Sequence, residues 1–305
     1  MLFNGILLYL VVFKTPKFLR VYAILIGNSA IIDFFASFVS LLTQQRIIPA
    51  GSSLIYFSYG PCRLLGPGFC YVAYTLMLSC YTHALYSILF SFYFRYYVLR
   101  KPQLSHLSLK IAIAVIAIPS ILQFAIVSGD NYRQEYLISI LADRFPQYNV
   151  TGETISGHRS VFEWPVFTAI LHMTLPITPV YICILILRRR IVSMLSKDMM
   201  SKQTRKIHAQ LLKAITYQAC LPIFFLLGVI SYGIGQLGLY NHPMLESFTF
   251  LSFGMMPMLT PLLSLYFIRP YRDYTLARFF GFVTKNSSTN GTTVVSTIIH
   301  ERKPK

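Results

Sequence analysis

The sequence has few charged residues for its length. Asp, Glu, Lys and Arg make up 12% of its 305 residues, about half their share in an ordinary soluble domain, whereas hydrophobic residues make up 55%. One soluble core cannot bury so many apolar side chains, so the composition argues against a soluble globular protein. A lipid bilayer supplies the second apolar environment that such a composition needs.

Cysteine is also scarce. The five cysteines, Cys62, Cys70, Cys80, Cys183 and Cys220, show no metal-ligand spacing. The sequence therefore predicts neither a zinc site nor a disulfide scaffold. The formal net charge of +17 does not indicate nucleic-acid binding, because the basic residues gather in the gaps between apolar runs and not on one face of a folded module.

Seven apolar runs are present in the sequence, at residues 1–13, 21–42, 66–94, 107–128, 162–187, 211–236 and 244–268. All but the first reach the ~20 residues that a membrane span needs. Backbone groups left unpaired in lipid cost several kcal/mol, so the runs are predicted to be helices. We interpret the short first run as the remnant of a membrane helix and not as a signal peptide. The expected fold is an all-α bundle of seven transmembrane helices over residues 1–283, followed by a disordered cytosolic tail at 284–305.

The basic residues are distributed unevenly among the gaps. When the gaps are assigned alternately to the two sides of the membrane, 22 of the 27 Lys and Arg residues fall on one side and six of the ten acids on the other. By the positive-inside rule the basic side is cytosolic, which places the N-terminus outside. Asn149, in an Asn-Val-Thr sequon of the longest outer loop, is then a glycosylation candidate.

A few polar residues lie inside the predicted spans, where each is costly and is therefore a functional candidate. Asn28 and Asp33 share the second run and Asn4 lies in the first, so an interior network of amides and a carboxylate is plausible. A structural link between helices and a role in switching explain such a network equally well. For His83 and His172, a satisfied core histidine is the more common case, and a position facing a mid-membrane cavity is the alternative.

The later spans contain several prolines, which promote kinks because each interior proline removes a helix hydrogen bond. They are Pro119, Pro165, Pro176, Pro179, Pro222, Pro257 and Pro261. After the last span, aromatic and basic residues at helical spacing over 269–280 predict a short interfacial helix. The basic segment 188–213 suits either a protein partner or anionic lipid headgroups, and the sequence leaves both open.

Five short motifs, taken in order along the chain, resemble those of a known receptor family. They lie at residues 13–17 (FKTPK), 45–51 (QRIIPAG), 60–62 (GPC), 94–97 (FRYY) and 268–272 (IRPYR). Together they resemble the nematode serpentine receptors of class delta (Srd), which are seven-transmembrane G-protein-coupled chemoreceptors. The resemblance implies an unidentified small-molecule ligand, a heterotrimeric G protein, no cofactor, and the plasma membrane of sensory neurons or their cilia.

A more distant resemblance, to rhodopsin-like receptors, implies a set of residues for G-protein coupling and switching. The set matches their second-span Asn and Asp, the Arg-Tyr pair that ends the third span and, loosely, the Pro and Tyr of the seventh. We add the first-span amide as a neighbour in the expected network. These residues are Asn4, Asn28, Asp33, Arg95, Tyr96, Pro261 and Tyr266.

The spacing from Pro261 to Tyr266 is longer than in rhodopsin-like receptors, and two further features depart from their pattern. Phe94 precedes Arg95 where those receptors have an acid, so an ionic lock to the adjacent residue is excluded. The outer loop at 129–161 contains no cysteine, so the usual bridge from the third span to this loop cannot form. Cys62 and Cys70 are the outer cysteines that remain, and the sequence leaves open whether they pair.

The resemblance also implies a mechanism, in which an outer ligand shifts the helix bundle between two packings and opens its inner end around Arg95. By depth in the membrane alone, the candidates for the ligand pocket are Tyr74, His83, His172, Tyr232 and Phe248. A transporter or channel is the principal alternative, although the sequence shows no internal repeat and few buried charges. An enzyme is not expected, because no acid pair, histidine cluster or activated nucleophile occurs at a membrane boundary.

Overall fold

The computed structural model describes residues 1–100, 105–148, 150–196, 202–240 and 242–279. The chain divides into two compact units, Met1–Arg272 and Asp273–Lys305. The glycosylation candidate Asn149 and the predicted tail at 284–305 lie outside the described residues.

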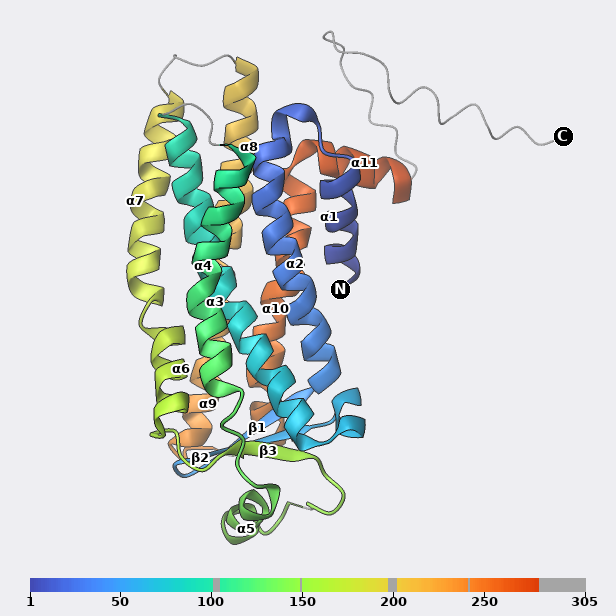
Figure 1. Ribbon diagram of the computed structural model, residues 1–305, viewed down its shortest axis with the longest axis vertical. Coiled ribbons are helices and arrows are strands. Elements are labelled where there is room, and N and C mark those ends of the chain that lie inside the picture. The colour runs from blue at the N-terminus through green and yellow to red at the C-terminus, as the bar shows by residue number, and fades with distance from the viewer. Residues whose placement is uncertain (101–104, 149, 197–201, 241, 280–305) are drawn as a thin grey trace, which may run out of the picture. The chain divides into compact units, whose positions relative to one another are not determined.

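Helices make up most of the described chain (Figure 1). They are α1 (Leu2–Phe13), α2 (Arg20–Thr43), α3 (Pro67–Val98), α4 (His106–Val127), α5 (Gln134–Arg144), α6 (Trp164–Thr174), α7 (Ile177–Ser196), α8 (Lys202–Gln218), α9 (Ile223–Gln236), α10 (Pro243–Phe267) and α11 (Arg269–Phe279). Each predicted apolar run coincides with helix. Helix α11 occupies the segment where an interfacial helix was predicted.

Six stretches of the described chain are long and apolar enough to cross a membrane. They are Lys17–Thr43, Pro67–Val98, His106–Val127, Trp164–Ser196, Arg205–Gln236 and Pro243–Phe267. Helix α1 is apolar but has 12 residues, fewer than the ~20 of a full span. The six longer runs are thus confirmed as candidate spans, and α1 contributes a shorter seventh helix to the bundle.

Proline divides two of the spans, because it lacks the N–H that would continue the helix. Pro176 separates α6 from α7, and Pro222 immediately precedes α9. Pro119, Pro257 and Pro261 instead lie within continuous helices. The sequence could therefore indicate where breaks are possible, but it did not indicate which prolines would break a helix.

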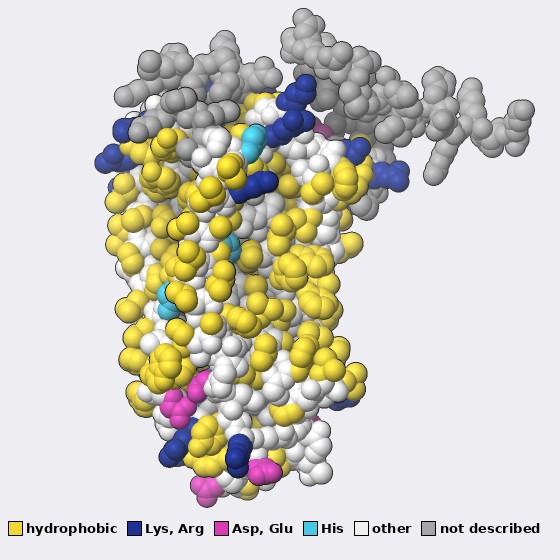
Figure 2. All heavy atoms as spheres, viewed as in Figure 1, with side chains coloured by type: hydrophobic (Ala, Val, Ile, Leu, Met, Phe, Trp, Pro, Cys, Tyr) yellow, Lys and Arg dark blue, Asp and Glu magenta, His cyan; other side chains and the backbone are white. Residues whose placement is uncertain are grey.

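Helix α3 is central, because it contacts α2, α4, α7 and α8. Its most apolar window is 61% buried, compared with 17% for α4 and 11% for the span formed by α6 and α7. The apolar side chains that α4, α6 and α7 leave uncovered require a lipid environment. Figure 2 shows this hydrophobic belt, with most Lys and Arg side chains at one end and most Asp and Glu at the other, as predicted from the gaps.

A three-stranded antiparallel sheet at the outer end was not predicted. Its strands are β1 (Gln45–Ala50), β2 (Ser53–Ser58) and β3 (Ile155–His158), in the order β1-β2-β3. The sheet joins the loop before α3 to the loop after α4. Gly51 has φ +66 in the two-residue turn between β1 and β2, a position that hairpin turns commonly assign to glycine.

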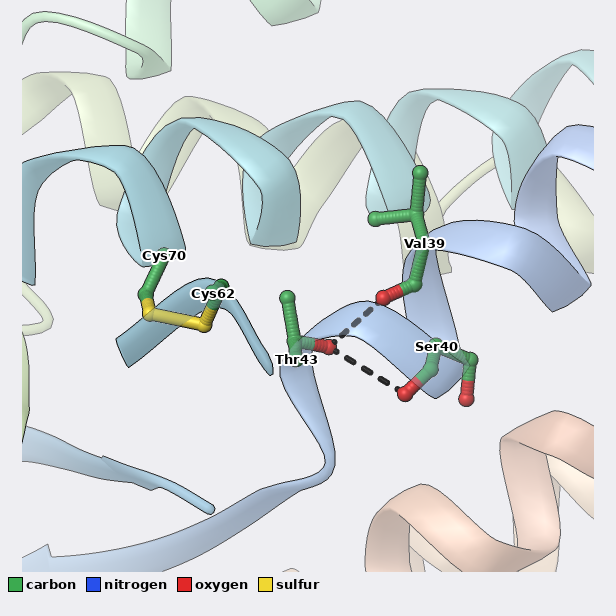
Figure 3. The surroundings of a disulfide bond; sticks show 5 residues. All are labelled: Val39, Ser40, Thr43, Cys62 and Cys70. Carbon is green, nitrogen blue, oxygen red and sulfur yellow. Dashed lines mark hydrogen bonds between the residues drawn. A yellow bond between two sulfur atoms is a disulfide. The ribbon is translucent and has the colours of Figure 1, made fainter. Parts of the chain in front are cut away.

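A disulfide fixes the chain after this hairpin. Cys62, in the 3₁₀ turn Pro61–Leu65, is bonded to Cys70 in the first turn of α3, with their Cα atoms 5.2 Å apart. Figure 3 shows the bridge beside the end of α2, where the Thr43 hydroxyl donates to the Val39 carbonyl at 3.0 Å. The structure thus answers the question of pairing that the sequence left open.

Candidate functional site

The inner end of α3 holds Arg95 in a buried position. The residue is 4% exposed, and its guanidinium carbon lies 5.9 Å from the centre of the Tyr22 ring. Its Nε and Nη1 atoms have no hydrogen-bond partner among the described residues. Tyr22 also contacts α8, through a 3.4 Å hydrogen bond between its hydroxyl and His208 Nδ1. Because burying a cation without an acid is costly, this packing leaves Arg95 with unused bonding capacity.

Two other residues predicted to act in G-protein coupling, Tyr96 and Tyr266, lie outside this buried site. Tyr96 is half-buried, and its hydroxyl accepts a hydrogen bond from Arg190 Nη1 at 3.5 Å. Tyr266 is 64% exposed and packs edge-on against Phe267. Pro261 is buried inside α10. Tyr266 therefore faces lipid in this packing.

The predicted network of Asn4, Asn28 and Asp33 is divided in the structure. Asn28 Nδ2 donates to Ser87 Oγ at 3.0 Å, and His83 Nε2 lies 3.2 Å from the same hydroxyl and 3.4 Å from Asn28 Oδ1. This group links α2 to α3. Asp33 does not join it, because five residues of helix turn its side chain about 140° away from that of Asn28.

Asn4 belongs to a different contact. Its Nδ2 donates to the Pro257 carbonyl in α10 at 2.9 Å. That carbonyl lies one turn before Pro261, whose missing N–H leaves it without its usual helix donor. Asn4 therefore satisfies a backbone group that a proline has freed, which is a specific reason for an amide in the first helix.

Asp33 lines a cavity of about 60 Å³ in the middle of the bundle. Its other polar walls are Tyr81, Thr82, Gln218 and Thr260. Gln218 Nε2 donates to the Thr260 carbonyl at 3.1 Å and to Ser264 Oγ at 2.9 Å, which connects α8 to α10 at the cavity edge. The space admits a few waters, whereas ordinary ligand pockets measure roughly 300–1,000 Å³.

An aromatic cluster lies between this cavity and the outer end of the bundle. The Tyr74 hydroxyl donates to that of Tyr56 at 3.0 Å, and their ring centres are 4.5 Å apart. Phe250 meets the Tyr74 ring edge-on at 5.9 Å. Tyr232 packs against the same core, and its hydroxyl donates to Gln236 Oε1 at 2.8 Å. Tyr74 and Tyr232 are thus brought together, with Tyr56 contributed by β2.

Phe248 does not belong to this cluster. It is 42% exposed, whereas Phe250 is 8% exposed and fills the position beside Tyr74. Two residues of helix rotate a side chain by about 200°, so the two phenylalanines point to opposite faces of α10. Phe248, which was assigned by depth alone, therefore lies on the exposed face of α10, and Phe250 lies on the face that meets Tyr74.

His172 occupies a separate polar contact on the other side of α3. Its Nδ1 lies 2.8 Å from Gln123 Oε1 in α4, and its Nε2 lies 2.9 Å from the Tyr86 hydroxyl in α3. Thr82 donates to the same Gln123 oxygen at 2.9 Å. Both ring nitrogens of His172 are therefore used between helices. His83 uses only Nε2, for Asn28 and Ser87, and its buried Nδ1 has no hydrogen-bond partner among the described residues.

An ion pair that the sequence did not indicate joins α10 to the outer loops. Arg46 Nε in β1 donates to Glu246 Oε2 at 2.5 Å, and the Tyr148 hydroxyl donates to Oε1 at 2.7 Å. Burial opposes the charge on Arg46, but the hydrogen bond and charge of Glu246 outweigh it and raise the Arg46 pKa. Burial, reinforced by Glu246, raises the pKa of Tyr148 to about 12. The first turn of α10 is thereby tied to both outer loops.

Comparison with solved structures defines the class of fold. The chain is similar to squid rhodopsin, with a TM-score of 0.63 at 15% sequence identity, over 91% of this chain and 76% of that one. The likeness establishes a rhodopsin-like seven-helix fold in a multi-pass membrane protein. At this identity it concerns the fold alone.

Sequence comparison defines the family. Residues 1–277 match the model of the serpentine type 7TM GPCR chemoreceptor Srd. Serpentine receptors class delta-18 and class delta-19 of Caenorhabditis elegans are 38% and 37% identical, each over 88% of this chain and over 82% and 81% of their own lengths. Class delta-3 is 34% identical over 92% of this chain. The chain therefore belongs to the Srd family of serpentine chemoreceptors, as its motifs indicated, and that family is not a class of enzymes.

Proposed function

We propose that this receptor binds an extracellular small molecule and signals to a cytosolic heterotrimeric G protein, at the plasma membrane of sensory neurons or their cilia. The observation that carries the proposal is the burial of Arg95 at the inner end of α3, with no ion pair to an acid in the part of the chain that the structure describes. Opening of the inner ends would give this guanidinium new acceptors, such as the carbonyl groups of an inserted protein segment. A partner that binds the open packing better than the closed one shifts the equilibrium toward it.

The polar contacts between helices are the proposed switch elements. Asn4, Asn28 and Asp33 each lie at a junction that α2 or α10 makes with a neighbour, and Pro261 and Tyr96 lie farther toward the inner end. Movement of α10 or α3 has to break or exchange these bonds. Tyr266 is a switch element only if α10 rotates, because it faces lipid in the closed packing.

The ligand is proposed to bind in the outer half of the bundle, at Tyr74, Tyr232 and Phe250 and beneath the sheet. His83 and His172 lie deeper, at the flanks of this region. The central cavity of about 60 Å³ is far smaller than a ligand pocket. A ligand must therefore displace the aromatic cluster, and the displacement supplies the differential affinity that a switch requires.

The transmission step is tested by expression with a reporter G protein and a screen of small molecules for an agonist. Arg95→Ala should abolish the response to agonist at normal surface levels, because it removes the proposed contact. Arg63→Ala is the matched control, since Arg63 is an exposed arginine at the outer end. Unchanged signalling by Arg95→Ala would refute the coupling role of this residue.

The rival function, transport or conduction, predicts a different biochemical result. Purified protein in lipid should accelerate nucleotide exchange on a G protein when agonist is present. It should not pass solute across a sealed vesicle. Solute flux without nucleotide exchange would replace the receptor proposal by a transporter or channel.

A further inference from the structure

A groove of about 600 Å³ is open to the lipid between α3, α4 and α7. Its walls include Leu89, Phe90 and Tyr93 of α3, Pro119 of α4, and Ile186 and Leu187 of α7. These apolar walls lie within helices that cross the bilayer, so the groove is at the depth of the hydrocarbon. Whatever fills it must be apolar.

The groove lies in the inner half of the span that α3 forms. Helix α3 runs from the outer to the inner side, so Tyr86 marks the mid-membrane end of the groove and Tyr93 marks its inner end. The seven residues from Tyr86 to Tyr93 rise about 10 Å, and Tyr96 lies a further turn toward the inner end, so the groove and Tyr96 together cover about 15 Å, half of the ~30 Å hydrocarbon thickness. The hydrogen bond of the Tyr86 hydroxyl to His172 closes the mid-membrane end with a polar contact.

Two arginines meet at the inner end. Arg190 follows Leu187 and Ile186 by three and four residues, so it continues the same face of α7, and its Nη1 donates to the Tyr96 hydroxyl at 3.5 Å. The guanidinium carbon of Arg100 lies 4.7 Å from the centre of the Tyr96 ring. The ion pairs found among the described residues involve neither arginine. Two cations thus converge on one tyrosine with no acid between them.

We propose that this groove binds an anionic phospholipid of the inner leaflet, with one acyl chain along α3 and α7 and the phosphate between Arg100 and Arg190. Planar guanidinium groups suit phosphate oxygens, and the cytoplasmic leaflet is rich in anionic lipid. The chain itself cannot neutralise this side, because 22 of its 27 basic residues are predicted to lie there. An acidic protein segment would use the arginines but would leave the groove unfilled.

The headgroup contact is tested with purified receptor in phosphatidylcholine nanodiscs that are titrated with phosphatidylserine, without agonist or G protein. Arg190→Gln should weaken phosphatidylserine binding about tenfold more than Arg188→Gln does. Arg188 belongs to the same basic triplet and is exposed, so the two variants remove the same charge. Equal weakening by both variants would show attraction to the surface charge alone and overturn the proposal.

The groove is tested by filling it. Ile186→Trp should displace the bound lipid, whereas Leu185→Trp, on the exposed neighbouring face of α7, should not. Soluble glycerophosphoserine should bind too weakly to measure, because it lacks the chain. Thermal unfolding of each variant confirms that it is folded. Lipid binding that Ile186→Trp leaves intact, or tight binding of an acidic peptide in place of lipid, would overturn the assignment. Because no signalling is measured, the result is independent of the proposed receptor function.

Discussion

At the scale of single residues, the two phenylalanines of α10 give a direct test of helix phase. Phe250→Ala should lower stability by about 3 kcal/mol, because it opens a cavity beside Tyr56 and Tyr74 in the packed core. Phe248→Ala should cost less than about 1 kcal/mol, because its side chain is 42% exposed to lipid. Thermal unfolding in one detergent compares them. Equal losses would contradict the assigned faces of α10.

Tyr148 supports a prediction about pH. Its hydroxyl donates to Glu246, and its pKa, raised mainly by burial to about 12, keeps it protonated well above neutral pH. A pKa raised above the unfolded value contributes stability that is fully present below about pH 10 and is lost as pH rises toward 12. Tyr148→Phe should therefore lower the melting temperature by about 2–4 °C, equally at pH 6.5 and pH 8.5. If the two proteins had the same melting temperature at pH 8.5 but not at pH 6.5, the raised pKa of Tyr148 would be contradicted.

At the scale of elements, the sheet depends on a close approach between β2 and β3. A Cβ atom at Gly157 would collide with the Leu54 carbonyl oxygen across the strand pair. Gly157→Ala should therefore separate β3 from β2 and expose the outer loop to protease. Gly129→Ala serves as the control, since nothing lies within 4 Å of the added atom. Equal protease resistance of the two variants would show that the pairing tolerates a side chain.

The sequence predicted the helices well because membrane spans are marked by length and hydropathy, two properties that do not depend on tertiary contacts. It did not predict the sheet, although β-branched and aromatic residues lie on both sides of Gly51 and Ser52 within residues 45–58, a recognisable hairpin signal. A search for runs of ~20 residues passes over strands of six. The third strand pairs across a sequence distance of about a hundred residues, and only the folded chain brings it there.

The same limit applies to the candidate site. Depth along a span placed Tyr74 and Tyr232 in the bundle interior, because depth follows from residue number. It could not select Phe250 over Phe248, or separate Asn28 from Asp33, because these choices depend on helix rotation. The ion pair of Arg46 with Glu246 joins residues from two distant segments and leaves no local pattern. The rotation of each helix about its axis and the contacts between distant segments therefore become known only from the folded structure.

At the scale of the whole molecule, orientation decides whether Arg95 can meet a cytosolic partner. The uneven distribution of Lys and Arg predicts that α5 lies outside the cell and that the inner end of α7 lies in the cytosol. Ser139 in α5 and Ser196 at the end of α7 are both exposed. In a background without the free cysteines Cys80, Cys183 and Cys220, Ser139→Cys should react with an impermeant thiol reagent on intact cells. Ser196→Cys should react only after permeabilisation. The reverse pattern would place Arg95 on the outer side and exclude coupling to a G protein.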